Sequence, residues 1–272
     1  MVRQIGDFAG TRLPGDVIAA RATLQTMLPA GAARNAIDCA LWDLAAKLRG
    51  VSVAEILGVA EPRACGTCFI LSLGSPQAMA AQALSVPDLP LLKLKLGAPD
   101  NAARMIAVRS TRPDARLVGD ANEGWSVADL PRLAGIAADA GLEMIEQPLP
   151  AANDQVLADM DLPVQICADE SCAPGASIDR LVDCYDALNN KLDKAGGLTA
   201  ALGLAGNAWR PCVKIMIGSM VSTSLSMAPA MTLASFADWI DLDSPLLLRS
   251  DRPGGMVIKY GVIEPPQPAF WG

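Results

Sequence analysis

The stretch LPLLKLKLG, from Leu89 to Gly97, has the composition of a buried strand but carries two lysines. Lys93 and Lys95 occupy alternate positions, and alternate residues of a strand point to the same face. Two ammonium groups on one side of an apolar strand repel each other, so the arrangement needs a reason. The stretch therefore predicts a strand whose lysines face a charged site.

Similar apolar runs recur on both sides of this stretch, spaced at roughly 20 to 30 residues, which is the spacing of strand–helix units. Short apolar runs bounded by turn residues are typical of buried parallel strands. The predicted strands are Thr67–Leu73, Leu91–Leu96, Arg116–Asp120, Met144–Glu146, Val164–Ala168, Ala187–Lys191, Val213–Ile217 and Trp239–Leu242.

Segments with helical periodicity lie between these strands. Alternation of strands and helices predicts a parallel sheet, either closed into a barrel or open and doubly wound. The sequence has no GxGxxG or P-loop motif, which disfavours the nucleotide-binding version of the open sheet. The predicted helices are Ser75–Leu84, Asn101–Ser110, Ser126–Ala140, Asn153–Met160, Ala176–Cys184, Gly197–Ala208 and Ser222–Phe236.

The remaining parts of the chain suggest three regions. Residues 1–60 are predicted to be a mostly helical, partial N-terminal capping region, with a strong amphipathic helix from Ala32 to a stop at Gly50. A short second helix follows, with Ser52 as its N-cap. Residues 61–246 form the predicted barrel, and residues 247–272 run back towards the cap.

Composition excludes several classes of function. The net charge of −7 argues against a nucleic-acid or anionic-membrane partner. The absence of histidine removes Ser-His-Asp triads, Cys-His dyads and His-ligated metals. The uncharged segment 215–237 has the length of a membrane span, but its Ser, Thr, Gly and Pro content favours buried barrel core.

The seven cysteines are interpreted as reduced and structural. Cys65 and Cys68 have CxxC spacing, but the chain has no second CxxC to complete a zinc site. The pair also leads into an apolar run, whereas a redox CxxC opens a helix. A cytoplasmic location follows as the expectation.

Charged residues follow the apolar runs at strand after strand. The carboxyl ends of parallel barrel strands meet at one face, where active sites are built. Six of the eight predicted strand ends deliver a charge, and these charges are therefore expected to form one site. The residues are Lys95, Asp120, Glu146, Asp169 and Lys191, with Asp241 and Asp243 at the last strand.

The residue types predict the chemistry of that site. Asp120, Glu146 and Asp169 supply only oxygen ligands, which suit a hard cation such as Mg²⁺. Lys95 and Lys191 lie across a closed barrel from one another, so one can remove an α-proton while the other returns it on the opposite face. The Mg²⁺ would stabilise the enediolate that forms between the two steps.

Two interpretations of Lys93 remain open. A second cation beside Lys95 would lower its pKa and favour the neutral amine that a base requires. Alternatively, Lys93 is a counterion for one of the acidic residues.

Several motifs resemble the muconate-lactonising subgroup of the enolase superfamily. KLK (93–95) is similar to its KxK motif, and NNKLDKAGGL (189–198) is similar to its second-lysine motif. DAN (120–122), EQP (146–148) and ADES (168–171) resemble its three metal-ligand motifs. LPAGAARNAIDCALWDLAAK (28–47), IEQPLPA (145–151) and DLDSP (241–245) resemble the dipeptide epimerases of the L-Ala-D/L-Glu type most closely.

This resemblance implies a (β/α)7β barrel with a truncated α+β capping domain. It implies an isomerase that binds one Mg²⁺ per active site and inverts an α-carbon of a dipeptide, in the recycling of cell-wall peptides. Lys95 and Lys191 would be the acid/base catalysts, and Asp241 and Asp243 would hold the substrate's α-ammonium. Lys194 is predicted to be a surface or loop residue. The implied metal ligands are Asp120, Glu146 and Asp169, with Asn122 in support.

The resemblance also leaves alternatives. Family members begin with some tens of residues of capping strands, and this chain reaches LPAGAARNA by residue 28, so those strands are expected to be missing. A catalytically impaired remnant is therefore one alternative. Another is an o-succinylbenzoate synthase or cycloisomerase, although their substrates lack the amino group that Asp241 and Asp243 would bind. A homo-oligomer is compatible with the sequence.

Overall fold

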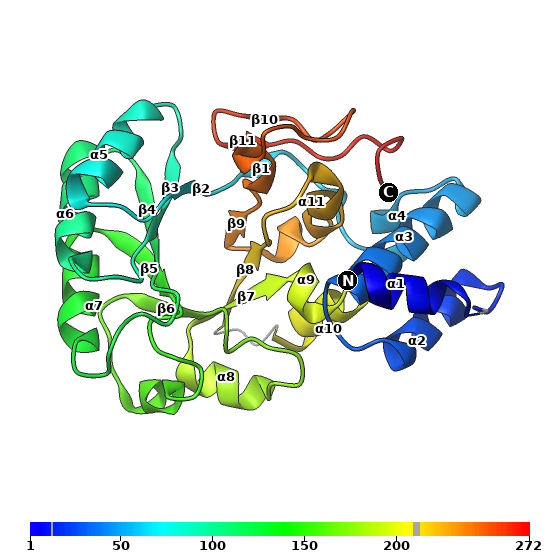
Figure 1. The fold of residues 1–272 in the computed structure, drawn as a ribbon, viewed down its shortest axis with the longest axis horizontal. Helices are drawn as coiled ribbons and strands as arrows, with labels where there is room; N and C mark the ends of the chain where they lie inside the picture. Colours follow the sequence, from blue (N-terminus) through cyan, green and yellow to red (C-terminus); the bar gives the residue numbers. More distant parts are fainter. Residues whose placement is uncertain (12, 209–212) are drawn as a thin grey trace.

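The computed structural model describes residues 1–11, 13–208 and 213–272 (Figure 1). Within these ranges, eight strands pair in parallel in the order of the sequence. The prediction of eight strands is confirmed. They are β2 (Phe69–Leu71), β3 (Leu91–Lys95), β4 (Arg116–Asp120), β5 (Leu142–Glu146), β6 (Gln165–Ala168), β7 (Ala187–Lys191), β8 (Lys214–Gly218) and β9 (Trp239–Asp241).

The sheet is a nearly closed barrel. The Cys68 N–H donates to the carbonyl of Ile240 at 2.7 Å, and the Leu242 N–H donates to Thr67 Oγ1 at 2.9 Å. These bonds bring β9 against the chain that enters β2, so the first and last strands meet. The barrel, and not the open sheet, is therefore the fold, and the predicted α/β modified TIM barrel is confirmed.

Helices cover the outside of the barrel (Figure 1). A core of apolar side chains lies between them and the strands, and a second apolar cluster fills the barrel interior with Val118, Met144, Cys167 and Met216 among its members. The helices are α5 (Pro76–Ser85), α6 (Asn101–Thr111), α7 (Leu130–Asp139), α8 (Ile178–Cys184), α9 (Leu192–Ala195), α10 (Leu198–Ala208) and α11 (Ser224–Met231).

Three predicted helices differ from the observed elements. The α-helix predicted over 153–160 is a 3₁₀ helix, η1 (Asp154–Asp159), the form that short connecting turns commonly adopt. Helix α7 begins four residues later than predicted, with a proline in its first turn. Helix α11 ends at Met231, soon after Pro229, and a separate 3₁₀ helix, η2 (Ala234–Phe236), follows.

The N-terminal residues form four helices in the described part of the chain: α1 (Val2–Ala9), α2 (Val17–Met27), α3 (Ala32–Arg49) and α4 (Val53–Leu57). The predicted boundary signals are confirmed. Gly50 ends α3 in the left-handed conformation, with φ 67°, and the Ser52 side chain caps α4 by accepting from the Glu55 N–H.

The C-terminal residues join two distant parts of the molecule. Strands β10 (Ile258–Lys259) and β11 (Val262–Ile263) form a small antiparallel sheet with β1 (Cys65–Gly66). Beyond them, Trp271 Nε1 donates to the carbonyl of Cys39, and the Gly272 N–H donates to Asp43. The end of the chain therefore packs on α3.

The uncharged segment 215–237 and the cysteines were both interpreted from the sequence, and the structure can be compared with each interpretation. In the described ranges no helix has the length and apolar character that crossing a bilayer requires. The uncharged run 215–237 instead contributes β8, α11 and η2. The six cysteines in the described ranges are free thiols, and Cys212 lies outside the described residues.

Candidate active site

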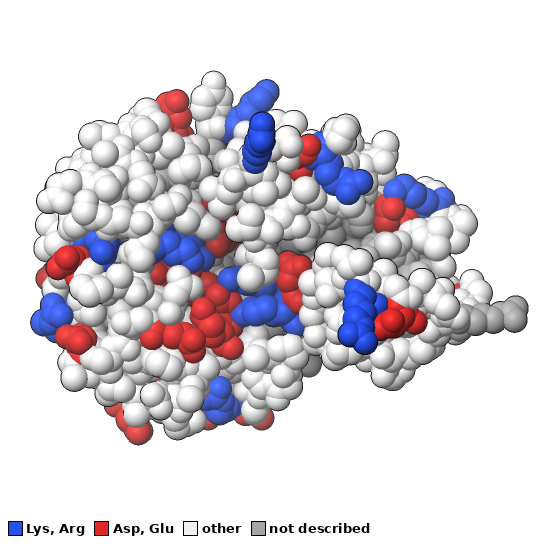
Figure 2. All heavy atoms as spheres, in the orientation of Figure 1, with Lys and Arg blue, Asp and Glu red and all other residues white. Residues whose placement is uncertain are grey.

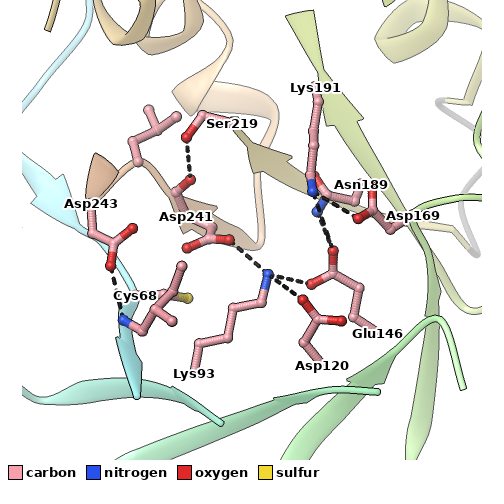
Figure 3. Close-up of polar contacts among 12 residues, drawn as sticks. Cys68, Lys93, Asp120, Glu146, Asp169, Asn189, Lys191, Ser219, Asp241 and Asp243 are labelled. Carbon is pink, nitrogen blue, oxygen red and sulfur yellow. Dashed lines mark hydrogen bonds and ion pairs between the residues drawn. The ribbon is translucent and has the colours of Figure 1, made fainter. Parts of the chain in front are cut away.

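The register of the barrel brings the predicted residues to one end. Lys95, Asp120 and Glu146 are directly paired across β3, β4 and β5. On the other side of the barrel, Lys191 is level with Gly218, and Gly218 is level with Asp241. Side chains that are level on neighbouring strands and face the interior meet, which explains the charged cluster in Figure 3.

Lys93 lies at the centre of this cluster (Figure 3). Its Nζ is 2.7 Å from Asp241 Oδ2, 2.5 Å from Glu146 Oε2 and 3.4 Å from Asp120 Oδ2, and its side chain is only 2% exposed. Burial alone would lower the pKa of Lys93, but the three carboxylates outweigh burial and raise it well above its ordinary value. Its contacts are those of a counterion.

Lys95 extends from the same face of β3 towards solvent. Its Nζ donates to Asp120 Oδ2 at 2.7 Å and to Asn122 Oδ1 at 3.0 Å, and its side chain is 28% exposed. The Asn122 N–H in turn donates to the other carboxylate oxygen of Asp120 at 3.0 Å. Lys95 is thus held next to a carboxylate while its ammonium remains accessible from the barrel mouth.

Lys191 occupies the opposite wall, at the end of β7. Its Nζ donates to Asp169 Oδ2 at 2.7 Å and lies 3.8 Å from Glu146 Oε1. Burial lowers the pKa of Lys191, but the charges of Glu146 and Asp169 outweigh this and raise it. In this arrangement Lys191 is an ammonium and therefore a proton donor.

Lys194 was predicted to be a surface or loop residue, and that prediction is wrong. It lies on α9, one helical turn after Lys191, and its ammonium contacts both the side chain and the carbonyl of Asp169. Burial would raise the pKa of Asp169, but the two lysines hold it below its usual range. The signal in the sequence was the spacing of three residues between Lys191 and Lys194. This spacing brings Lys194 back beside the end of β7 only if a helix begins directly after Lys191, as α9 does.

Asp241 and Asp243 extend the acidic cluster to the seam between β9 and β2. The Ile70 N–H donates to Asp243 Oδ2 at 2.8 Å. Burial and the neighbouring charge of Asp241 raise the pKa of Asp243 to about 7. Asp241 Oδ1 is buried and has no hydrogen-bond partner within the described residues, so the pair can accept a further donor.

Asn189 is a polar residue of the site that the strand-end rule did not identify. Its Nδ2 donates to Glu146 Oε1 at 2.7 Å, and its Oδ1 is buried without a partner among the described residues. A side chain at Gly218 would overlap this amide, since an added Cβ would approach Asn189 Oδ1 to 2.4 Å. The alternation that identified Lys93 and Lys95 applies here too, because Asn189 and Lys191 share one face of β7.

Gln147 holds the loop that carries Asp169. It has a positive φ of 37°, and its buried Oε1 accepts from the Asp169 and Ser171 N–H groups at 2.9 and 3.0 Å. Its Nε2 donates to Ser171 Oγ and to Tyr185 OH. Left-handed backbone is costly for a non-glycine residue, and this fully bonded amide stabilises it at the site.

The carboxylates suit a cation by chemistry. Asp120, Glu146 and Asp169 present oxygen donors on adjacent strands, and burial together with the charges of the other two raises the pKa of Glu146 to about 8. A hard cation among them would offset that repulsion. In the described residues, however, no three acidic or cysteine side chains converge as ready ligands, because the lysine ammonium groups lie between them.

All nine predicted residues therefore lie at or near the carboxyl end of the barrel. Figure 2 shows basic and acidic atoms side by side near the middle of the face seen in Figure 1. The arrangement places two amines on opposite walls and a group of carboxylates between them, which is suited to moving protons at a bound anion. The nine residues are Lys93, Lys95, Asp120, Asn122, Glu146, Asp169, Lys191, Asp241 and Asp243.

Two family models match this chain. Residues 78–269 match the enolase C-terminal domain-like family. Residues 17–58 match the N-terminal domain of mandelate racemase / muconate lactonizing enzyme.

Two named relatives have the same sequence identity to this chain. An N-acetyl-D-glutamate racemase from a Pseudoalteromonas species is 43% identical over 246 residues, covering 90% of this chain and 78% of the relative. An L-Ala-D/L-Glu epimerase from Escherichia coli is also 43% identical over 246 residues, covering 90% of this chain and 77% of the relative.

Solved structures agree with the fold. An enolase family member from Agrobacterium tumefaciens, with homology to dipeptide epimerases and with bound sodium and L-Ala-L-Glu, has a TM-score of 0.90 and 43% identity. The similarity covers 99% of this chain and 82% of that one. A dipeptide epimerase from Cytophaga hutchinsonii, complexed with Mg and D-Ala-L-Val, has a TM-score of 0.85 and 26% identity over 92% of this chain and 72% of that one.

Proposed function

Since the chain belongs to the mandelate racemase / muconate lactonizing enzyme family of enolase-like proteins, we propose that it is an Mg²⁺-dependent epimerase of L-Ala-D/L-Glu-type dipeptides. The observation that carries the proposal is the placement of Lys95 and Lys191. They lie on β3 and β7, which are four strands apart in an eight-stranded barrel, with Glu146 between them. A substrate bound above the carboxylates would present opposite faces of its α-carbon to the two amines.

The two lysines would share the proton transfer. One, as the neutral amine, removes the α-proton, and the other, as the ammonium, delivers a proton to the opposite face. Lys191 is in the donor state in this structure, and its position is fixed by Asp169, which Lys194 also contacts. The exposed Nζ of Lys95 is free to exchange protons with solvent between turnovers.

Asp120, Glu146 and Asp169 are the residues that would hold Mg²⁺. When bound, the cation would supply positive charge that favours loss of a proton next to a carboxylate. Lys93 neutralises the part of the cluster nearest Asp241, and Asn122 and Asn189 orient Asp120 and Glu146 by hydrogen bonds.

Asp241 and Asp243 would bind the α-ammonium of the dipeptide. The orphan oxygen of Asp241 and the raised pKa of Asp243 both indicate that the pair lacks one compensating positive charge. The alternatives with no substrate amine, o-succinylbenzoate synthases and cycloisomerases, would leave the buried Oδ1 of Asp241 without a donor, which is costly.

The equal identity to an N-acetyl-D-glutamate racemase favours a second candidate, racemisation of an N-acylated glutamate. That substrate has the same α-proton chemistry but no ammonium. The acidic pair at the end of β9 supports the dipeptide.

An assay of both substrates separates the candidates. The protein is incubated with Mg²⁺ and either L-Ala-L-Glu or N-acetyl-L-glutamate, and the stereoisomers are resolved by chiral chromatography. The proposal predicts faster inversion of the dipeptide than of N-acetyl-L-glutamate. It also predicts that Asp243→Asn reduces kcat/KM for the dipeptide about tenfold or more, because the variant removes a charge-assisted hydrogen bond to the substrate ammonium. The same variant should have little effect on the acylated substrate. Faster inversion of N-acetyl-L-glutamate would support the second candidate, and no inversion of either would support the inactive remnant.

The cellular setting is a further part of the proposal. A role in recycling cell-wall peptides, a cytoplasmic location and a homo-oligomeric state all stay predictions.

A further inference from the structure

Lys191 is followed by a very short helix and then by two glycines in positive-φ conformations. Helix α9 is a single turn that carries Lys194, and Gly196 and Gly197 follow it with φ values of 87° and 121° before α10 begins. The turn therefore leaves carbonyl groups at the end of one helix and N–H groups at the start of the next without partners in their own helices. Because Lys191 and Lys194 flank or belong to α9, their positions depend on how this turn is held.

Arg34 of α3 binds the end of α9. Its Nη2 donates to the Ala195 carbonyl at 2.7 Å, and its Nε donates to the Gly196 carbonyl at 3.0 Å. The guanidinium thus satisfies exposed carbonyls at a helix C-terminus, where a positive charge is favoured. A third guanidinium nitrogen contacts the carbonyls of Gln25 and Leu28, which ties the same residue to the end of α2.

Asp38, one turn further along α3, binds the start of α10. Its Oδ2 accepts from the Thr199 N–H at 2.9 Å, and its Oδ1 accepts from Thr199 Oγ1 at 2.7 Å. Asp38 is completely buried. A carboxylate at a helix N-terminus is the electrostatic complement of the Arg34 contact, although here it comes from another helix.

Neighbouring contacts complete the attachment. Asn35 Nδ2 donates to Asp193 Oδ1 at 3.1 Å, and Trp42 Nε1 donates to Thr199 Oγ1 at 2.9 Å. The two glycines fit closely beneath α3, because an added Cβ would approach Arg34 to 2.5 Å at Gly196 and Asp38 to 2.5 Å at Gly197. The turn and α3 are therefore complementary in both shape and charge.

We propose that Arg34 and Asp38 are positioning residues for the reaction. By fixing both sides of the Gly196–Gly197 turn they set where Lys191 and Lys194 stand, and through Lys194 they hold Asp169. The N-terminal helical region thus positions the side of the site that carries Lys191, and it does not position the side that carries Lys95. This inference rests on the proposed two-lysine function.

The test uses the asymmetry of the two walls. In D₂O with Mg²⁺, exchange of the glutamyl α-proton is followed by NMR separately from L-Ala-L-Glu and from L-Ala-D-Glu. Lys191→Ala identifies the diastereomer whose proton faces Lys191. Asp38→Asn and Arg34→Lys are then measured at saturating substrate, with Asp43→Asn as the matched control, because Asp43 is on the same helix but contacts Lys47 and Gly272 instead.

We expect Asp38→Asn and Arg34→Lys each to slow α-proton exchange of the Lys191-facing diastereomer about tenfold to a hundredfold, which is the effect of a small displacement of one catalytic group. Exchange of the other diastereomer should slow less than about twofold. Asp43→Asn should change neither. Amide hydrogen exchange of residues 192–199 in the protein without substrate should accelerate in Asp38→Asn and not in Asp43→Asn. If Asp38→Asn does not fold, Thr199→Val is used instead. This variant exchanges the hydroxyl that donates to Asp38 for a methyl group, keeps the Thr199 N–H, and should show the same asymmetry in weaker form.

An equal loss of exchange from both diastereomers, or no loss from either, would overturn the inference while the proposed function stands. Failure of the unaltered protein to exchange either dipeptide would remove the proposed function and the inference with it.

Discussion

Lys93 and Lys95 share one face of β3 but have different surroundings. Lys93 is buried among Asp241, Glu146 and Asp120, whereas Lys95 reaches the barrel mouth. The apparent electrostatic cost of the pair is offset because each ammonium has carboxylate partners. The sequence pattern indicated the cluster, but it did not show how the charges divide among the partners, because that depends on side-chain length and rotamer and not on strand position.

Replacement of Lys93 should destabilise the fold more than replacement of Lys95. Lys93→Met removes the positive charge that neutralises the buried acidic cluster, and loss of one partner from a buried ion cluster costs about 3–5 kcal/mol. Lys95→Met is the matched control, since its partly exposed ammonium can be replaced by solvent. Urea unfolding at pH 7 measures both, and equal free energies of unfolding for the two variants would contradict the counterion role.

Removal of either of the two lysines proposed to be catalytic should abolish epimerisation. Lys95→Ala and Lys191→Ala are each expected to lower the rate of inversion at least about a hundredfold, the usual contribution of a positioned acid or base. Lys47→Ala, an exposed lysine of α3, is the control and should remain fully active. Near wild-type inversion by either catalytic variant would show that the two-base assignment is wrong.

Magnesium binding should release protons at neutral pH. The pKa of Glu146 is raised to about 8, so at pH 7 the cluster without a cation retains a proton that a bound cation expels. Affinity should therefore fall as the pH decreases from 8 towards 6. Isothermal titration calorimetry in buffers of different ionisation enthalpy measures the release, and a heat of binding that does not depend on the buffer would contradict this protonation state.

At the scale of elements, the strand ends were predictable and the turns between them were not. Strands β4, β5 and β7 each end in a charged residue, so the positions of Asp120, Glu146 and Lys191 followed from local sequence. Helix α9 and the contact of Lys194 with Asp169 did not follow, because a four-residue helix leaves no periodicity to detect. Its support comes from α3, more than 140 residues away in sequence.

The double glycine after α9 should be sensitive to substitution. Gly197→Ala forces a side chain into positive φ and against Asp38, so we expect it to cost at least about 1 kcal/mol of unfolding free energy. Gly203→Ala in α10 has open space around the new Cβ and ordinary helical φ, and should be neutral or slightly stabilising. Thermal unfolding of the two variants compares them, and equal stability would argue against the fit between α3 and this turn.

At the scale of the whole molecule, the barrel brings together charges that are as much as 148 residues apart in the chain. The order of strands and the position of the site follow from the repeated strand–helix unit, which is why the sequence could predict them. The repeat alone left an open sheet as an alternative, and the closure between β9 and β2 is established by the hydrogen bonds that join them. The sequence could not predict Asn189 as a partner of Glu146, or the attachment of the C-terminal Trp271 to α3. Those contacts depend on register and on long-range packing.

The central claim is that two lysines on opposite walls of this barrel transfer protons to and from one α-carbon. Its most direct test is the isotope content of the first product formed from L-Ala-L-Glu in D₂O with Mg²⁺. Two-base transfer predicts that newly formed L-Ala-D-Glu carries deuterium at the glutamyl α-carbon while the remaining L-Ala-L-Glu is still protonated. Product that keeps the substrate's own proton, or dipeptide that is neither inverted nor exchanged, would contradict it.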